Sequence, residues 1–463
     1  MKQTLFNGIE LMESTSGRWN TVLPLDFELN RVITDTREDC SGGLFLALRG
    51  ENFDAHDFLD SAVSSGAAAL CIEKTFATKI NPAWNIPVLL VDDTLTAYQA
   101  IANSYKKRFH NLRSVAITGS MGKTSCKEII RSILVAAVGE EAVYATKSNT
   151  NNQVGVPQNL LNVNSKHRFC VLEMGTNHFG EIEPLSRTLE PDVALINSIA
   201  PCHLEAFGDT HGVAQEKTKI FAALKSDGIA VIPTDCPEIN YLLGQTKQFK
   251  TMRFGTDVEA VYHGGNLHGS CIELIFKDLN KRIKLDWLLS GAHQASNAAA
   301  AATVALALGI EPEIIAEGLR NCVLPGMRMK VAHVNGIDWI NDAYNASPES
   351  VAATLRWLKE FVKADDLVLV LGDMLELGKV SNSQHKKVLA QAFELFPEAA
   401  FVLVGPEMNR AGGNIDVPNK NCFCKDSEAA KEVLKIFLSV GKTVLLKGSR
   451  GIKLEKLWPD ENN

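Results

Sequence analysis

The chain has 463 residues, more than a single hydrophobic core usually organises, and a formal net charge of −7 at pH 7. Hydrophobic residues make up 46% and charged residues 22%, which is typical of a soluble globular protein. The negative charge argues against a general nucleic-acid surface, and no apolar run reaches the roughly 20 residues that a membrane helix needs. The first residues lack the apolar core of an export signal, so we expect a cytoplasmic protein.

Three segments of different texture follow one another along the chain. Residues 1–92 carry short strand-like runs at 44–48, 68–72 and 87–91, separated by polar turns. From 93 to 321, apolar runs alternate with amphipathic segments, which is typical of βαβ units on a parallel sheet. Within this segment, residues 247–287 alternate polar and apolar side chains and predict antiparallel strands. Residues 322–463 carry a second alternating set, so we predict an α/β protein of three units.

The ten cysteines are scattered through these segments without a CxxC pair. Cys422 and Cys424 form the closest pair and have no further cysteine or histidine partner nearby in the sequence. This usage favours reduced thiols over disulfides or a zinc site.

The stretch VAITGSMGKTSCKEII predicts a strand, a glycine turn and a helix over residues 115–130. Free backbone N–H groups and the helix dipole favour an anion at such a turn, and glycines permit its close approach. The Lys123 ammonium can reach terminal phosphates, and the Thr124 hydroxyl can coordinate Mg²⁺. The usual pattern is GxxxxGK[ST], whereas this chain has GxxGKT, so a plain glycine turn is the alternative. Dinucleotide binding is disfavoured because the chain contains no GxG.

Further motifs follow in order: TKSNTNNQVGVP, LEMGTNHFGEI, APCHLEAFGDTHGVAQEKTKIF, SGAHQASNAAAA, PGMRM, NDAYNASPES, LGDMLELG and LLKGSRG. With GxxGKT, this set resembles the Mur ligase family, ATP-dependent amide-forming enzymes of peptidoglycan synthesis. The first segment, ITDTREDCSGGLFLALRGENFDAHDF, is similar to the UDP-sugar-binding domain of the member that adds D-alanyl-D-alanine to UDP-N-acetylmuramoyl-tripeptide. Two positions depart from the family pattern: Ser148 replaces a usual glycine, and Gln294 follows His293 where asparagine is frequent.

The resemblance implies the role of each of the three domains. It implies a mixed α/β domain over 1–92 for the UDP-substrate and a central parallel-sheet domain of P-loop ATPase type over 93–321. A Rossmann-like α/β domain over 322–463 would close on ATP and bind D-alanyl-D-alanine. The implied partners are UDP-N-acetylmuramoyl-tripeptide and D-alanyl-D-alanine, with ATP and two Mg²⁺ ions as cofactors. We expect a monomer.

Amide formation needs an activated carboxylate, and phosphorylation by ATP gathers negative charges that cations must neutralise. Glu173 follows an apolar run at a predicted strand end, where its carboxylate could be an oxygen ligand for a hard Mg²⁺ ion. The alternative interpretation of the same pattern is a glutamate that caps a helix. The resemblance assigns catalysis to Lys123, Glu173, His203 and Lys217, and metal binding to Thr124, Glu173, His203 and Lys217. Carbamylation of Lys217, which the family lysine carries, needs a lowered pKa, and the sequence alone does not separate Lys217 from Lys219.

The resemblance also assigns the remaining binding residues. Asn297 could equally cap the helix that it opens, and Asp35 or His56 could equally belong to plain turns. The ATP site is assigned to Gly119, Ser120, Met121, Gly122, Lys123, Thr124, His293, Asn297, Arg328, Asp342 and Asn345. The substrate sites are assigned to Asp35, Thr36, Arg37, Asn52, His56, Asn149, Asn151, Asn152, Lys447, Ser449 and Arg450.

Two other kinds of function stay open. A neighbouring Mur ligase that adds one amino acid, or a folate polyglutamylating relative, is disfavoured by the first segment and by the lack of a DNPR-like run in the C-terminal part. A nucleotide-dependent switch that lost catalysis is disfavoured by the joint presence of Glu173, His203 and Lys217.

Overall fold

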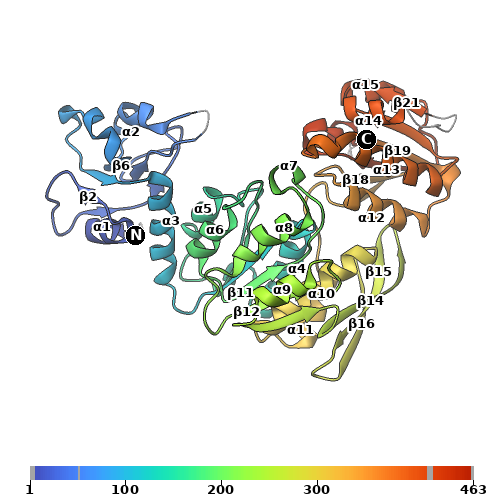
Figure 1. Cartoon of the computed structure of the whole chain (residues 1–463), viewed down its shortest axis with the longest axis horizontal. Coiled ribbons are helices and arrows are strands. Elements are labelled where there is room, and N and C mark those ends of the chain that lie inside the picture. The colour runs from blue at the N-terminus through green and yellow to red at the C-terminus, as the bar shows by residue number, and fades with distance from the viewer. Residues whose placement is uncertain (1–5, 51–52, 414–420, 460–463) are drawn as a thin grey trace.

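The computed structural model describes residues 6–50, 53–413 and 421–459, and it contains three α/β units on separate main sheets (Figure 1). The three predicted units are confirmed, and they follow one another along an arc with the central unit in the middle. All ten cysteines are free thiols, as expected. Within the described ranges, no helix is both long and apolar enough to cross a bilayer.

The N-terminal unit has a five-stranded sheet in the order β2-β7-β6-β5-β4, in which β2 runs antiparallel to β7 and the other pairs are parallel. Its strands are β2 (Arg18–Trp19), β4 (Val32–Ile33), β5 (Leu44–Leu46), β6 (Ala69–Glu73) and β7 (Val88–Val91). A small antiparallel pair and two helices complete it: β1 (Phe6–Asn7), β3 (Glu28–Leu29), α1 (Gly8–Thr15) and α2 (Leu59–Ser64).

Helix α3 (Thr94–Lys107) joins the N-terminal unit to the central unit. Tyr98 and Ile101 pack into the N-terminal core, while Ala102, also on α3, packs into the central core. Consecutive residues on a helix point roughly 100° apart, so Ile101 and Ala102 face different cores and one helix serves both.

The central sheet has nine strands in the order β16-β15-β14-β13-β12-β11-β8-β10-β9. Its strands are β8 (Arg113–Thr118), β9 (Val143–Ala145), β10 (Phe169–Glu173), β11 (Val193–Ile196), β12 (Ile229–Pro233), β13 (Lys250–Phe254), β14 (Val258–Asn266), β15 (Gly269–Phe276) and β16 (Lys281–Trp287). The antiparallel prediction for 247–287 is wrong for β13, which pairs in parallel with β12, and is confirmed for β14, β15 and β16. The sheet is therefore mixed rather than purely parallel.

Helices cover both faces of the central sheet because its strands are apolar on both sides. Val115 and Ile117 of β8 pack with α4 and α10, while Ala116 between them packs with α5, α6 and α8 on the other face. The helices are α4 (Lys123–Val138), α5 (Gly155–Leu160), α6 (Ile182–Leu189), α7 (Leu204–Phe207), α8 (Thr210–Lys217), α9 (Ile239–Gln245), α10 (Ala292–Ala307) and α11 (Pro312–Arg320).

The C-terminal unit has a six-stranded sheet in the order β17-β18-β22-β19-β20-β21, with β17 antiparallel to β18 and the rest parallel. Its strands are β17 (Lys330–Val334), β18 (Ile337–Asp342), β19 (Leu367–Gly372), β20 (Ala400–Val404), β21 (Asn421–Cys424) and β22 (Thr443–Lys447). Its helices are α12 (Pro348–Lys359), α13 (Ser381–Leu395), α14 (Pro406–Gly412) and α15 (Ser427–Leu434). The loops that follow the carboxyl ends of β18 and β22 lie against the central unit and form part of the cavity between the two units.

Candidate active site

A cavity of about 800 Å³ lies between the central and C-terminal units. Ligands bind at the carboxyl ends of strands in open α/β sheets, and the loops after β8, β10, β18 and β22 all contribute to its wall. The cavity brings together most of the predicted site residues: Ser120, Met121, Gly122, Lys123, Thr124, Asn149, Asn151, Asn152, Glu173, His203, His293, Asn297, Arg328, Asp342, Asn345, Lys447, Ser449 and Arg450.

The glycine turn between β8 and α4 depends on both of its glycines. A Cβ on Gly119 would overlap the side chain of Asn197, which follows β11. Gly122 has φ 74°, and a Cβ there would lie 2.7 Å from Oδ1 of Asn297. A side chain at either position would push the turn outward, so glycine is what lets its backbone lie close to the sheet.

The turn presents one free cationic group to the cavity. Lys123 begins α4, and its Nζ donates a hydrogen bond to the Gly119 carbonyl oxygen at 2.7 Å. Within the described ranges, no carboxylate lies at ion-pair distance from this ammonium. The charge at this helix N-terminus is therefore available to an anionic ligand.

Three oxygen-bearing side chains from different elements meet beside the turn. The Thr124 hydroxyl donates to Oε2 of Glu173 at 2.7 Å, and the Asn151 amide donates to Oε1 at 3.0 Å. Glu173 ends β10 and is 3% exposed. The predicted chemistry of this trio fits Mg²⁺, which prefers a few protein oxygens together with water and phosphate oxygens. No cluster of three His, Cys, Asp or Glu side chains suited to a metal occurs among the described residues, so phosphate oxygens would have to complete the shell.

Lys217 and Lys219, which the sequence could not separate, differ sharply in the structure. Lys217 ends α8 and is 1% exposed, whereas the side chain of Lys219 is 53% exposed and lies 3.8 Å from Glu183. Burial, together with the nearby Lys123 ammonium, lowers the pKa of Lys217 to about 8. Lys217 does not itself line the cavity, but Lys123 and Cys202, which do line it, are near enough to influence the pKa of Lys217. Its neutral form is accessible near physiological pH, as carbamylation requires.

His203 reaches the C-terminal unit. It lies in the loop after β11, with φ 47°, and its Nδ1 is 3.0 Å from Oε2 of Glu376 in the loop after β19. The hydrogen bond to His203 lowers the pKa of Glu376. Glu376 also lines the cavity, and the sequence analysis did not single it out, although it lies in the LGDMLELG motif.

Three residues predicted for the ATP site, His293, Asn297 and Arg328, lie in the wall of the cavity. Burial lowers the pKa of His293 to about 4, so its ring is neutral at pH 7. The Asn297 amide donates to Oε1 of Gln294 at 3.1 Å, so the departure from the family pattern supplies its partner. The Arg328 guanidinium stacks over the ring of Tyr344, with its central carbon 3.8 Å from the ring centre. The sequence analysis did not single out Tyr344.

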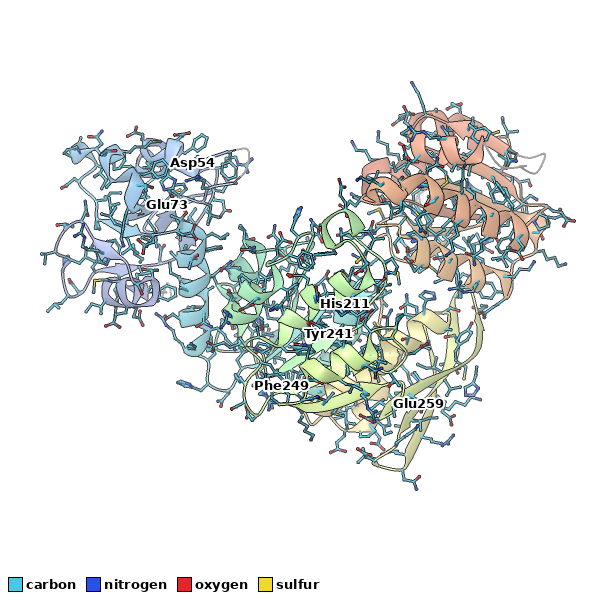
Figure 2. The ribbon with its side chains drawn as sticks, in the orientation of Figure 1. Asp54, Glu73, His211, Tyr241, Phe249 and Glu259 are labelled. Atoms are coloured by element: carbon cyan, nitrogen blue, oxygen red, sulfur yellow. The ribbon has the colours of Figure 1, made fainter. Side chains whose placement is uncertain are left out.

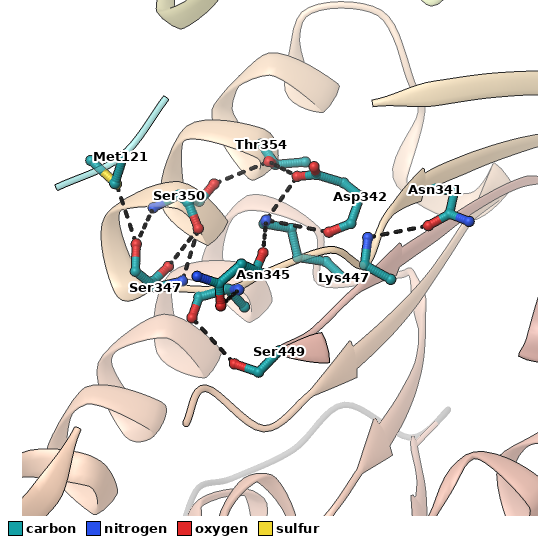
Figure 3. Close-up of polar contacts among 11 residues, drawn as sticks. Met121, Asn341, Asp342, Asn345, Ser347, Ser350, Thr354, Lys447 and Ser449 are labelled. Carbon is teal, nitrogen blue, oxygen red and sulfur yellow. Dashed lines mark hydrogen bonds and ion pairs between the residues drawn. The ribbon is translucent and has the colours of Figure 1, made fainter. Parts of the chain in front are cut away.

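Lys447 holds the loop after β18 in place (Figure 3). Its buried Nζ lies 2.8 Å from Oδ2 of Asp342 and donates to the Asn345 carbonyl oxygen at 3.0 Å. The two strands that carry Asp342 and Lys447 pair in register at these residues. In this geometry Lys447 organises the loop that carries the predicted ATP residues, and its predicted substrate contact stays a prediction.

Other predicted substrate residues are placed around this loop. Ser449 is buried, donates to the Ala346 carbonyl oxygen at 3.5 Å and accepts from the Leu375 N–H at 3.0 Å. Arg450 is more exposed and pairs with Glu455 at 3.1 Å. Asn152 accepts a hydrogen bond from the N–H of Gly155, the first residue of α5, at 2.8 Å. Asn149 is exposed at the cavity wall.

The candidates in the N-terminal unit lie away from this cavity. The Arg37 guanidinium chelates both carboxylate oxygens of Asp35, and this hydrogen bonding lowers the pKa of Asp35 to about 2. Thr36 lies between them and is half-buried. Asn52 is outside the described residues.

His56 occupies a structural position. The ring is 1% exposed, Nδ1 contacts Asp54 at 2.6 Å, and Nε2 accepts from the Glu73 N–H at 3.1 Å; Figure 2 labels both partners in the N-terminal unit. With both ring nitrogens engaged, His56 organises this unit and has no nitrogen left for a ligand.

The fold and the site together define a class of protein. A glycine turn with a lysine at the start of a helix, an oxygen-rich group beside it and a second α/β unit over the cavity are typical of an enzyme that binds a nucleotide between two domains. Two family models match the chain: the Mur ligase middle domain over residues 117–305, and the Mur ligase, glutamate ligase domain over residues 327–450. The chain belongs to the Mur ligase family.

Similar proteins extend this likeness over nearly the whole chain. The UDP-N-acetylmuramoyl-tripeptide--D-alanyl-D-alanine ligase of Bacillus subtilis is 33% identical over 443 residues, 93% of each chain. A crystal structure of MurF from Acinetobacter baumannii superposes with a TM-score of 0.89 at 29% identity and covers 98% of this chain and 97% of that one. The MurF ligase of Thermotoga maritima in complex with ADP gives a TM-score of 0.81 at 26% identity, covering 92% and 96%.

Proposed function

We propose that this chain is the ATP-dependent ligase that joins D-alanyl-D-alanine to UDP-N-acetylmuramoyl-tripeptide, forming the pentapeptide precursor of peptidoglycan. The supporting observation is the interdomain cavity that unites the glycine turn, Glu173 and His203 with the loops of the C-terminal unit. The Bacillus subtilis ligase with this activity in its name matches 93% of the chain, so the match includes the N-terminal unit. Because the reaction consumes ATP, we place it in the cytoplasm.

The reaction has two steps. The terminal carboxylate of the tripeptide attacks the γ-phosphorus of ATP, and the bond to the ADP oxygen breaks, giving an acyl phosphate and ADP. The amine of D-alanyl-D-alanine then attacks the acyl carbon, loses a proton and expels inorganic phosphate as the C–N bond forms. Lys123 neutralises the transferring phosphoryl group, and the N–H groups at the start of α4 hold its oxygens, since those of Ser120 and Met121 donate to Ser198.

The C-terminal unit completes the site. We assign Arg328, Asp342 and Asn345 to the nucleotide, and Ser449 and Arg450 to the dipeptide, because all five line the same cavity. Asp35, Thr36 and Arg37 stay proposals for the UDP moiety. Closure over the cavity excludes water, which would otherwise hydrolyse the acyl phosphate.

We further propose two Mg²⁺ ions, which would offset the charge of the phosphates. Thr124 and Glu173 have the oxygen donors for the first. His203 and carbamylated Lys217 would serve the second, supported by the burial of Lys217 and its lowered pKa. Incubating the protein with ¹³C-bicarbonate should give a carbamate carbon signal that disappears in Lys217→Ala and persists in Lys219→Ala. No signal in the wild type would reject carbamylation.

The function itself is tested by its product. The purified chain, ATP, Mg²⁺, UDP-N-acetylmuramoyl-tripeptide and D-alanyl-D-alanine should yield the pentapeptide by mass spectrometry, with one ADP for each product. Replacing D-alanyl-D-alanine by single amino acids, or the UDP-tripeptide by a folate, separates the related ligases. ADP release without pentapeptide would reject the assignment, and ATP binding without turnover on any of these substrates would favour a nucleotide switch.

A further inference from the structure

Glu376 and His203 come from different units and meet at the cavity. His203 follows β11 in the central unit, Glu376 follows β19 in the C-terminal unit, and Nδ1 and Oε2 are 3.0 Å apart. The Glu376 side chain is 64% exposed. An ion pair that exposed adds little to folding stability, so stability does not explain the contact.

Both partners hold an unusual backbone conformation. His203 has φ 47° and Glu376 has φ 63°, the left-handed region that residues with a Cβ rarely adopt. Strain of this kind persists where the surroundings impose it, and it concentrates at functional sites. Here two such residues, 173 positions apart in the sequence, contact each other directly.

The Glu376 loop is fastened to the body of the C-terminal unit. The Met374 N–H donates to Nε2 of His385 at 2.9 Å, and the Leu375 N–H donates to Oγ of Ser449 at 3.0 Å. Gly378 has φ 53°, and a Cβ there would lie 3.1 Å from Cβ of Glu205, next to His203. Glu376 therefore moves with the C-terminal unit and reaches His203 only when that unit lies against α7.

The contact determines which nitrogen of His203 is free. A carboxylate accepts, so Nδ1 carries a proton and donates it, and in the neutral ring Nε2 then keeps its lone pair. The ring also packs edge-on to Phe207, with centroids 6.2 Å apart. These two contacts fix the tautomer and restrict the orientation of the imidazole.

We propose that Glu376 is a positioning residue for this reaction: closure of the C-terminal unit places its carboxylate on Nδ1 of His203 and leaves Nε2 as an acceptor at the phosphate end of the cavity. This inference rests on the proposed function. It makes the arrival of the second domain a condition for a correctly oriented His203, so that phosphoryl transfer waits for closure.

The test compares Glu376→Ala and Glu376→Gln with Glu428→Ala, which removes an exposed, ion-paired glutamate of the same unit. Glu376→Ala should lower kcat for pentapeptide formation about 10- to 100-fold, as loss of a group that orients a histidine does. Glu376→Gln, whose amide oxygen can still accept from Nδ1, should retain more activity, and Glu428→Ala should match the wild type. Equal kcat in Glu376→Ala and Glu428→Ala would overturn the proposal.

A second readout does not depend on turnover. In ¹⁵N-histidine NMR of the protein with a non-hydrolysable ATP analogue and without Mg²⁺, with the His203 signals assigned from a His203→Gln variant, the wild type should show the Nδ1–H tautomer. Glu376→Ala should move the signals toward the Nε2–H tautomer, and an unchanged tautomer would contradict the positioning role. If the wild type itself makes no pentapeptide, the proposed function fails, while the NMR result still decides whether Glu376 controls His203.

Discussion

At the scale of single residues, charge placement determines what this site can do. Lys123 offers its ammonium at a helix N-terminus, with the Gly119 carbonyl oxygen as its hydrogen-bond acceptor. Glu173 is buried at the end of β10 and is held by Thr124 and Asn151. A cation and an anion that line one cavity without pairing suit a phosphate chain with Mg²⁺ bound beside it.

Replacing Lys123 by alanine should therefore reduce kcat about 100-fold or more, because a preorganised charge on the transferring phosphoryl group is lost. Initial rates of ADP and pentapeptide formation measure the effect. Lys219→Ala, which removes an exposed lysine of the same unit, is the control and should stay near wild type. Near-normal turnover in Lys123→Ala would mean that the turn does not hold the reacting phosphate.

At the scale of elements, buried polar contacts fix how the helices meet. Lys106 on α3 is 5% exposed, and its Nζ donates to the carbonyl oxygens of Leu189 at 2.5 Å and Glu190 at 2.9 Å. Those carbonyls end α6, where helices leave acceptors unpaired and favour a cation. This contact joins the linking helix α3 to the central unit.

The pH dependence of this contact can be predicted from its pKa. Burial lowers the pKa of Lys106 to about 8 from an ordinary value of 10.5. Between these values the unfolded chain binds a proton that the folded chain lacks, so this residue makes folding more favourable as pH rises. The unfolding free energy of the wild type relative to Lys106→Met should rise between pH 8 and 10.5 by up to about 3 kcal/mol. Urea titrations at several pH values measure it, and a difference that falls or stays constant would contradict the sign.

At the scale of the whole molecule, a few contacts join the C-terminal unit to the central unit around the cavity. The Trp357 indole donates to Oγ of Ser290 at 2.9 Å, and the Tyr262 hydroxyl donates to Glu360 at 2.7 Å. The Ser347 hydroxyl contacts the sulfur of Met121 at 3.2 Å (Figure 3). These three contacts are polar, and polar contacts between domains are typical of domains that move relative to each other.

Ser290→Ala should loosen this closure, because the Trp357 N–H loses its acceptor. A lost hydrogen bond of about 1 kcal/mol shifts a closure equilibrium about fivefold, so the phosphate released in excess of pentapeptide should increase by up to that factor. Ser270→Ala is the matched control, since Ser270 accepts from Trp287 at 2.7 Å within the central unit alone. If Ser290→Ala and Ser270→Ala release the same excess of phosphate over pentapeptide, the Trp357–Ser290 contact does not control the exclusion of water.

The sequence predicted the site better than it predicted the roles inside it. The GxxGKT turn, Glu173 and the β18 loop come together as expected because each follows a strand whose carboxyl end faces the cavity. The parallel pairing of β13 was missed because its alternating pattern suits either direction of pairing. The resemblance assigned His56 to the substrate site, but in the structure Asp54 and the Glu73 N–H contact its two ring nitrogens.

By itself, the sequence determined the local chemistry: a glycine turn before a helix, a lysine and a threonine at its start, and acidic or amide groups at strand ends, all properties of neighbouring residues. The tertiary structure decided which of Lys217 and Lys219 is buried, that Lys447 supports Asp342, and that Glu376 meets His203. The physical reason is that burial and pairing depend on groups brought together by folding from distant positions, and one sequence carries no local signal of those encounters.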